Sequence, residues 1–181
     1  MIDELEIRSQ DQGIGLTYIY LDYKDQDRQS PLNIIASFLK QLACRVDEVI
    51  PELLSLYKLF RTRGKQPELT HLLEALVSAS GHFQSCYVII DALDECDKKH
   101  RIDLLSVIGR LSEANFKVFT TSRPHPHDIL RFVENIPTLT IYADTDDIKN
   151  FLSVQLDTRL LHHQDLKGKI VTKLSLGAHG V

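Results

Sequence analysis

Apolar and polar stretches along the first half of the chain predict one strand followed by three helices. Residues 17–22 form an apolar, β-rich run after the turn-prone Gly-Ile-Gly segment at 13–15, so we expect a strand there. Ser30 and Pro31 then open a helix, because serine is a favoured N-cap, proline fits the first helical position, and apolar residues recur at three- and four-residue spacing. Two more helices are predicted further on, at residues 51–60 and from Pro67 to a stop at Gly81.

The second half of the chain begins with a run of a different kind. Residues 86–91 are apolar at every position until the final Asp91, so this run has no side suited to water and predicts a central strand of a parallel sheet. Helix and strand patterns then alternate, with helices expected at 101–114 and 129–133 and strands at 116–121 and 138–142. This order predicts an α/β fold in which helices cover a parallel sheet, because parallel neighbours need crossover connections.

From Thr145 onward the pattern is helical only. Thr145 is expected to cap a helix, the two aspartates after it suit the positive end of the helix dipole, and an apolar stripe follows. A last helix is predicted at residues 164–176. We therefore expect a first domain at residues 1–143 and the beginning of a helical domain at residues 144–181.

Composition and charge narrow the class of protein. With 43% hydrophobic and 25% charged residues over 181 positions, the chain is globular, which excludes disorder. The net charge is −4 and the short basic run at 98–101 is interpreted as a solvated face, so we expect no nucleic-acid partner. No apolar stretch approaches the roughly 20 residues that span a bilayer, so we expect no membrane segment and a cytoplasmic protein. Cys44, Cys86 and Cys96 match no zinc or disulfide framework and are interpreted as free thiols.

Candidate functional residues follow two neighbouring predicted strands. Asp91 ends one strand, with Asp94 and Glu95 shortly after it, and Ser122 and Arg123 follow the next strand. Ligands of open α/β sheets bind beyond the carboxyl ends of the strands. A carboxylate on a rigid strand suits Mg²⁺, an acidic pair suits the orientation or deprotonation of a water, and a guanidinium suits a phosphate oxygen. Acidic turns also serve merely as helix caps and solvated corners, and this alternative stays open, although the occurrence on successive strands favours function.

Two of these segments carry a family resemblance. Residues 86–96, Cys-Tyr-Val-Ile-Ile-Asp-Ala-Leu-Asp-Glu-Cys, resemble the Walker B segment of NACHT-type P-loop NTPases of the STAND class, with Ala92 at the family's small position. Residues 119–124, Phe-Thr-Thr-Ser-Arg-Pro, resemble the sensor 1 strand of the same proteins. Further similar segments extend the resemblance over nearly the whole chain, at residues 18–23, 30–31, 38–42 and 146–151. The chain looks most like the nephrocystin-type NACHT domains of filamentous fungal proteins, which implies a three-layer P-loop NTPase fold.

The resemblance also implies ligands, roles and partners. Asp91 would hold Mg²⁺ through its water shell, and Glu95 with Asp94 would position the attacking water. Ser122 and Arg123 would contribute to the binding of ATP or GTP, Arg123 by sensing the γ-phosphate. Such modules resemble nucleotide-dependent signalling switches, which associate with themselves or with protein partners through flanking domains such as ankyrin or WD40 repeats.

One element that this chemistry needs is missing from the sequence. The phosphate-binding loop G-x-x-x-x-G-K-[ST] occurs nowhere, because neither Gly64-Lys65 nor Gly168-Lys169 has the required neighbours. The resemblance therefore implies a chain truncated before the family's second strand and without the Walker A strand, with residues 1–12 as the remainder of the phosphate-loop helix. We expect little or no ATPase activity, and poor solubility or marginal folding because an unpaired strand edge remains.

Three hypotheses remain open. The chain is part of a NACHT switch whose phosphate loop is encoded upstream, or it is a nucleotide-free scaffold or interaction protein derived from such a module. The third hypothesis is an unrelated α/β enzyme that uses the carboxylates on another phosphorylated substrate and loses its Mg²⁺-dependent hydrolysis in Asp91→Asn.

Overall fold

The computed structural model describes residues 2–9, 13–46, 48–114, 116–124, 126–142, 144–157 and 164–177. The chain divides into two compact units, Met1–Glu134 and Asn135–Val181. The first unit is an α/β domain built on a parallel sheet. In the second unit the helix α7 (Thr145–Asp157) packs against the helix α8 (Gln164–Gly177), as the helical pattern predicted.

Three parallel strands form the described sheet, in the order β1 (Ile14–Tyr20), β2 (Ser85–Asp91) and β3 (Phe116–Thr120). The register pairs Tyr20 with Asp91 and Ile90 with Thr120, so all three strands end at the same edge. The apolar strand β2 lies in the centre, as its sequence predicted, because a central strand covered on both faces has no position for a solvated side chain. The expected α/β fold with a parallel sheet is confirmed.

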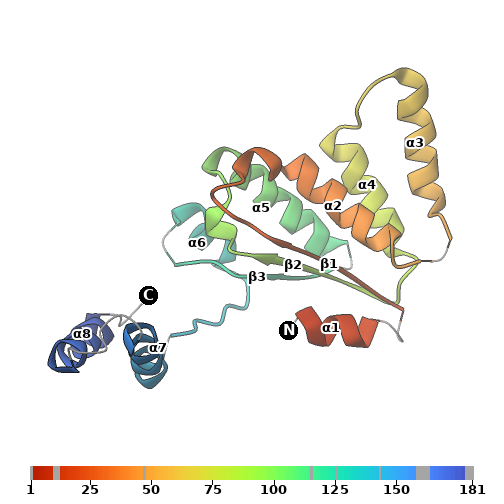
Figure 1. Cartoon of the computed structure of the whole chain (residues 1–181). Coiled ribbons are helices and arrows are strands. Elements are labelled where there is room, and N and C mark those ends of the chain that lie inside the picture. Colours follow the sequence, from red (N-terminus) through yellow and green to blue (C-terminus); the bar gives the residue numbers. More distant parts are fainter. Residues whose placement is uncertain are drawn as a thin grey trace. The chain divides into compact units, whose positions relative to one another are not determined.

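The helices of the first unit are α1 (Ile2–Ser9), α2 (Pro31–Ala43), α3 (Pro51–Arg63), α4 (Leu69–Ser80), α5 (Lys98–Glu113) and α6 (His127–Val133), with short 3₁₀ turns η1 (Gln26–Arg28) and η2 (Leu93–Glu95). Figure 1 shows α2, α4 and α5 on one face of the sheet. Their apolar sides bury Cys86, Val88 and Ile90 of β2 in the main core. The predicted N-cap of α2 is confirmed, because the Ser30 hydroxyl accepts a hydrogen bond from the amide of Asn33.

The opposite face of the sheet carries α1 (Figure 1). Leu16 and Ile89 point to this face and are fully buried outside the main core. A cavity of about 420 Å³ lies between α1 and the strands β2 and β3, with Tyr87, Lys117 and Phe119 among its lining residues. Helices therefore cover the sheet from both sides, which is the expected three-layer arrangement.

The two outer edges of the sheet differ in how their backbone groups are satisfied. On the β1 edge, the Gln41 side-chain amide bonds both the N–H and the C=O of Tyr18 at 2.9 Å, and Arg45 Nε donates to the Leu16 carbonyl. On the β3 edge, the backbone N–H and C=O groups of alternate residues point toward β2 or away from it. Since the Thr121 N–H bonds Ile90 of β2, those of Val118 and Thr120 point outward. Within the described residues of the first unit, no comparable side chain bonds this second edge.

The predicted strand at 138–142 was wrong. The segment has no strand pairing among the described residues, and Leu139 and Ile141 are 83% and 81% exposed. Its alternating Thr-Leu-Thr-Ile-Tyr pattern is locally suited to a strand, but a strand forms only where a neighbour accepts its hydrogen bonds.

Two smaller expectations also need correction. The strand β1 begins at Ile14, so Gly15 lies in the strand and only Gly13, with φ of +60°, lies in the turn. A Cβ atom on Gly15 would come within 2.7 Å of Cys86 Sγ, which explains the glycine through close packing. The cap of α7 is Asp144 instead of Thr145, because the Asp144 carboxylate accepts from the amide of Asp146 at 2.7 Å.

Candidate functional site

The candidate site lies at the carboxyl edge of the sheet, where β2 and β3 end side by side. The pairing continues beyond β3, since the Thr121 N–H donates to the Ile90 carbonyl and the Leu93 N–H donates to the Thr121 carbonyl at 2.8 Å. Between these bonds Ala92 has φ of 56° and is the one non-glycine residue with positive φ in the described ranges. This left-handed residue turns the chain sharply from β2 into η2, and so carries Asp94 and Glu95 to the end of β3.

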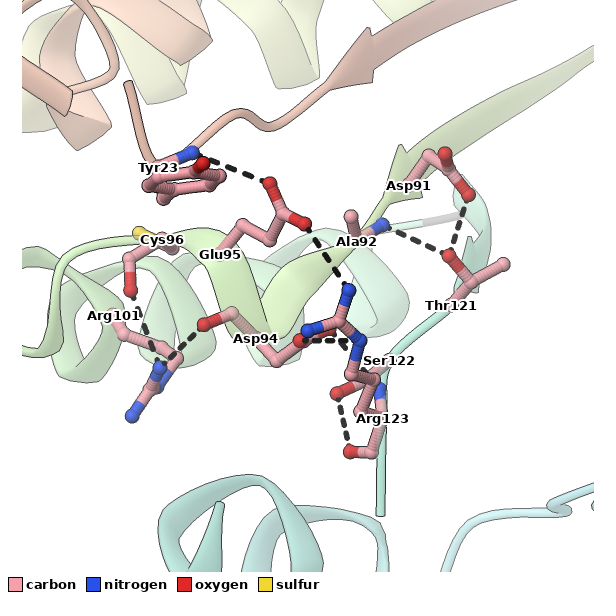
Figure 2. Close-up of polar contacts among 10 residues, drawn as sticks. All are labelled: Tyr23, Asp91, Ala92, Asp94, Glu95, Cys96, Arg101, Thr121, Ser122 and Arg123. Atoms are coloured by element: carbon pink, nitrogen blue, oxygen red, sulfur yellow. Dashed lines mark hydrogen bonds and ion pairs between the residues drawn. The ribbon is translucent and has the colours of Figure 1, made fainter. Parts of the chain in front are cut away.

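Asp91 is held by a threonine from the neighbouring strand end. The Thr121 hydroxyl donates a hydrogen bond of 2.5 Å to the Asp91 carboxylate and accepts one of 2.9 Å from the Ala92 N–H (Figure 2). Asp91 and Thr121 are next in register after the pair Ile90 and Thr120, which places both side chains on the same face of the sheet. Sequence reasoning missed Thr121, although the strand register points to it.

Asp94, Glu95 and Arg123 form a second contact group. The Arg123 backbone N–H donates to Asp94 Oδ1 at 3.0 Å. Its guanidinium lies 3.8 Å from the Asp94 carboxylate and 3.7 Å from the Glu95 carboxylate (Figure 2). The Arg123 side chain is 70% exposed, whereas the carboxylates are 11% and 23% exposed. The ion pairs are therefore loose and the guanidinium stays accessible to an anion from solvent.

The loop after β1 contacts the same acidic turn. The Tyr23 N–H donates to Glu95 Oε2 at 3.3 Å, and the Gln26 side-chain amide donates to the Glu95 carbonyl at 3.4 Å. Glu95 therefore bridges this loop and Arg123. No pattern in the sequence pointed to Tyr23 or Gln26, because both contacts join segments about 70 residues apart.

Of the five predicted site residues, the structure brings together Asp94, Glu95 and Arg123. Asp91 lies at the same edge, where its carboxylate contacts Thr121 and stands apart from the group around Arg123 (Figure 2). Ser122 makes only a local contact in that view, because its hydroxyl donates to the Arg123 carbonyl at 2.9 Å.

A buried arginine lies behind the acidic turn. Arg101 belongs to the short basic run that was expected to be a solvated face, but its side chain is only 9% exposed. The guanidinium donates to the carbonyls of Asp94 and Cys96 and pairs with Asp128. That expectation was wrong for Arg101, because the α-helical turn of α5 directs this residue inward while its neighbours Lys98 and Lys99 stay exposed.

The buried cysteines, Cys96 beside the acidic turn and Cys86 at the other end of β2, do not add a nucleophile. All three cysteines are free, as predicted. Burial raises the pKa of the Cys96 thiol to about 11, and burial likewise raises the pKa of the Cys86 thiol to about 11. Both thiols therefore stay protonated at neutral pH, which makes them poor nucleophiles.

The carboxylates at this edge offer Mg²⁺ oxygen ligands but do not enclose it. The described part of the chain contains no group of three or more acidic, histidine or cysteine side chains that converge on one metal position. Carboxylate oxygens are nevertheless the ligands that Mg²⁺ prefers, and this ion commonly takes one or two carboxylates together with waters and phosphate oxygens. The residues fit such a shared site at Asp91 and do not fit a cage made of protein ligands alone.

Comparison with known families places the chain. The model of the family described as nephrocystin 3, N-terminal, matches residues 1–123 of the chain. The chain belongs to this family. The match to the nephrocystin 3 N-terminal family ends at Arg123, so it contains the three strands and every residue of the predicted site. A search of curated proteins finds no match.

The nephrocystin-type resemblance is thereby confirmed at the level of this family.

None of the helices in the described ranges combines the length and the apolar content that a bilayer crossing requires.

Proposed function

We propose that this nephrocystin 3 N-terminal domain is part of a NACHT-type, nucleotide-dependent switch of the STAND class and contributes the metal and water side of an ATP or GTP site. One observation carries the proposal. The strands β2 and β3 end at one edge of the sheet, and there Arg123 reaches the carboxylates of Asp94 and Glu95. Phosphoryl-transfer sites combine metal-holding and water-orienting carboxylates with a cationic side chain in this way.

Each side chain has a role in this proposal. Asp91 holds Mg²⁺ through water, with its carboxylate fixed by the Thr121 hydroxyl. The bound Mg²⁺ neutralises charge on the phosphates. Glu95, assisted by Asp94, orients a water, and its own position is set by the Tyr23 amide and by Arg123. Arg123, with Ser122 beside it, binds a phosphate oxygen.

The loose pairing of Arg123 suits a switch. Its side chain is 70% exposed, and its guanidinium lies 3.7 Å or more from the two carboxylates. Only its backbone N–H makes a hydrogen bond to Asp94. A phosphate group offers charged oxygens that match the planar fork of the guanidinium. It can replace the carboxylates with little loss of free energy, because the existing ion pairs are exposed and loose. Exchange of Arg123 between carboxylate and phosphate would then couple the nucleotide to the end of β3 and to the chain that follows it.

A nucleotide-free scaffold is the second candidate function. The specific observation in its favour is that the sequence contains no G-x-x-x-x-G-K-[ST] loop, which supplies most phosphate contacts in P-loop proteins. For the switch, we propose that this loop is encoded outside the sequence printed here. Under both functions the chain by itself has little or no ATPase activity.

Binding and hydrolysis assays on the chain separate the candidates. Labelled ATP or GTP is titrated with Mg²⁺, phosphate release is followed, and Mn²⁺ is used as a paramagnetic substitute for Mg²⁺ in spectra of ¹⁵N-labelled protein. The switch proposal predicts no hydrolysis but a weak Mn²⁺ site at Asp91. A nucleotide-free scaffold predicts no Mn²⁺ site. Binding of ATP at micromolar affinity would exclude the scaffold function. Mg²⁺-dependent hydrolysis that disappears in Asp91→Asn would instead support an unrelated enzyme.

A further inference from the structure

Arg101 is a buried cation that the proposed chemistry does not use directly. Its side chain is 9% exposed and lies at the start of α5, behind the acidic turn η2. Nε and Nη2 donate to the two carboxylate oxygens of Asp128 at 2.6 and 3.2 Å. Nη1 donates to the carbonyls of Asp94 and Cys96 at 3.0 and 3.2 Å (Figure 2).

These bonds hold the backbone on both sides of Glu95. Asp94 and Cys96 are its direct neighbours, and a single Nη1 atom binds both of their carbonyl oxygens. The peptide planes around Glu95 are therefore fixed from the interior, while its carboxylate projects toward Tyr23 and Arg123. The direction of the side chain follows from the orientation of these planes.

Asp128 fixes the guanidinium in turn. It lies in the first turn of α6, the helix that follows β3, and its two oxygens match the planar fork of Arg101. A guanidinium buried to this degree needs a charged partner, because an unpaired charge in the interior is strongly destabilising. The pair joins the chain segment after β2 to the segment after β3, and these are the two segments that supply the site.

We propose that Arg101 and Asp128 are a positioning pair, which sets the orientation of Asp94 and Glu95 in the candidate site. That this orientation serves metal and phosphate binding rests on the proposed function. The orientation itself does not depend on the proposed function, because the hydrogen bonds that set it form within the chain without a ligand. Arg101 acts through the backbone and touches neither ligand.

Amide hydrogen exchange, measured by NMR on the full ¹⁵N-labelled chain, reports the orientation of Asp94 and Glu95 without any ligand. The Arg123 N–H is bonded to the Asp94 carboxylate, and the Tyr23 N–H is bonded to the Glu95 carboxylate. Both amides lose their acceptors if the acidic turn changes its orientation. Amides inside β2, such as that of Val88, report global stability and serve as the internal reference.

Two variants are compared with a matched control. Asp128→Asn keeps the shape of the side chain but removes its charge, and Arg101→Lys keeps the positive charge but removes the guanidinium fork. If one variant fails to fold, the other still tests the proposal. Asp103→Asn makes the same charge change as Asp128→Asn at an exposed aspartate of α5, two residues from Arg101 but on the solvent side of the helix. In Asp128→Asn or Arg101→Lys we expect exchange at Tyr23 and Arg123 to accelerate by about fivefold or more relative to Val88. The Asp103→Asn control is expected to leave this ratio unchanged.

The proposal is overturned if all amides accelerate in proportion, which indicates a purely structural pair, or if the two reporter amides do not respond. A Mn²⁺ titration of the same samples addresses the function separately. If the wild-type chain binds Mn²⁺ at Asp91, the proposed function is supported independently of the pair, because Arg101 bonds the backbone around Glu95 whereas Asp91 is held by Thr121. If the wild-type chain shows no such site, the proposed function fails, while the exchange ratio still decides whether the pair orients the turn.

Discussion

Ala92 has a backbone conformation that most side chains avoid, with φ of 56° and ψ of 50°. The left-handed region brings Cβ close to the following carbonyl, so the cost rises with branching at Cβ. Alanine combines a small side chain with the sharp turn that carries Asp94 and Glu95 to the end of β3. The small side chain of Ala92 thus has a steric explanation.

We predict that Ala92→Val lowers the free energy of unfolding by about 1 kcal/mol or more, because a β-branched residue is strained at positive φ. Urea denaturation followed by circular dichroism measures this change. Ala92→Gly is the control and should stay within about 0.5 kcal/mol of the wild type, since glycine adopts this conformation without strain but is more flexible when unfolded. Equal stability of the valine and glycine variants would contradict the steric explanation.

Thr121 is the second residue whose role can be tested by itself. Thr121→Val removes the hydroxyl that donates to Asp91 and accepts from the Ala92 amide, while the shape is retained. We expect a loss of about 1–2 kcal/mol in the free energy of unfolding, because two partners lose a hydrogen bond. Thr120→Val on the same strand is the control, with an expected change within about 0.5 kcal/mol. An equal loss of unfolding free energy in Thr120→Val would contradict a specific role for the Thr121 hydroxyl.

Sequence patterns identified one part of the site and missed another. Asp91, Asp94 and Arg123 were predicted as candidates because they stand at or shortly after the ends of two strongly patterned strands. Thr121 and Arg101 were missed, because their partners come from other segments, and a pattern along one chain does not report which helix face turns inward.

At the scale of elements, the hydrogen bonds between α5 and α6 predict a dependence of stability on pH. The guanidinium of Arg101, mainly through its hydrogen bonds, holds the pKa of Asp128 below its ordinary value of 3.8. A carboxylate with a depressed folded-state pKa contributes stability that is fully present above the unfolded value. This contribution is lost as the pH falls through the folded value.

We therefore expect Asp128→Asn to reduce the free energy of unfolding by about 2 kcal/mol at neutral pH. The difference from the wild type should persist down to about pH 4 and shrink below the ordinary pKa of 3.8. Urea unfolding at a series of pH values measures it, with Asp103→Asn as the control that lacks this dependence. A difference that stays constant into strong acid would mean that the charge of Asp128 is not what matters.

The elements themselves were largely predictable where local pattern and tertiary pairing agree. The strand β2 and the helix α2 were found from apolar periodicity and a Ser-Pro start. The segment at 138–142 was mispredicted, because its pattern suits a strand but strand formation depends on a neighbour elsewhere in the chain.

At the scale of the whole molecule, the unequal sheet edges predict self-association. The β1 edge is covered by Gln41 and Arg45, whereas the outward backbone groups of β3 have no such cover among the described residues of the first unit. Phe119, which is 46% exposed, stands on this same strand. Open apolar edges invite pairing with a second chain.

We expect the chain to associate with increasing concentration and Phe119→Lys to shift the molecule toward the monomer. Light scattering after size-exclusion chromatography over a concentration series is the measurement. Leu130→Lys is the matched control, because Leu130 on α6 is similarly exposed at 44% and should leave the association unchanged. A wild-type sample that is monomeric throughout and melts in a sharp, reversible transition would refute the expectation.

The central claim is that the carboxyl ends of β2 and β3 form the metal and phosphate side of a nucleotide site. Paramagnetic broadening by Mn²⁺, observed in spectra of the ¹⁵N-labelled chain, tests it most directly because it detects weak sites residue by residue. The account predicts broadening that centres on residues 91–95 and 121–123, is competed by Mg²⁺, disappears in Asp91→Asn and persists in Asp103→Asn. Broadening that is spread over the surface carboxylates, or that is the same in Asp91→Asn as in the wild type, would contradict it.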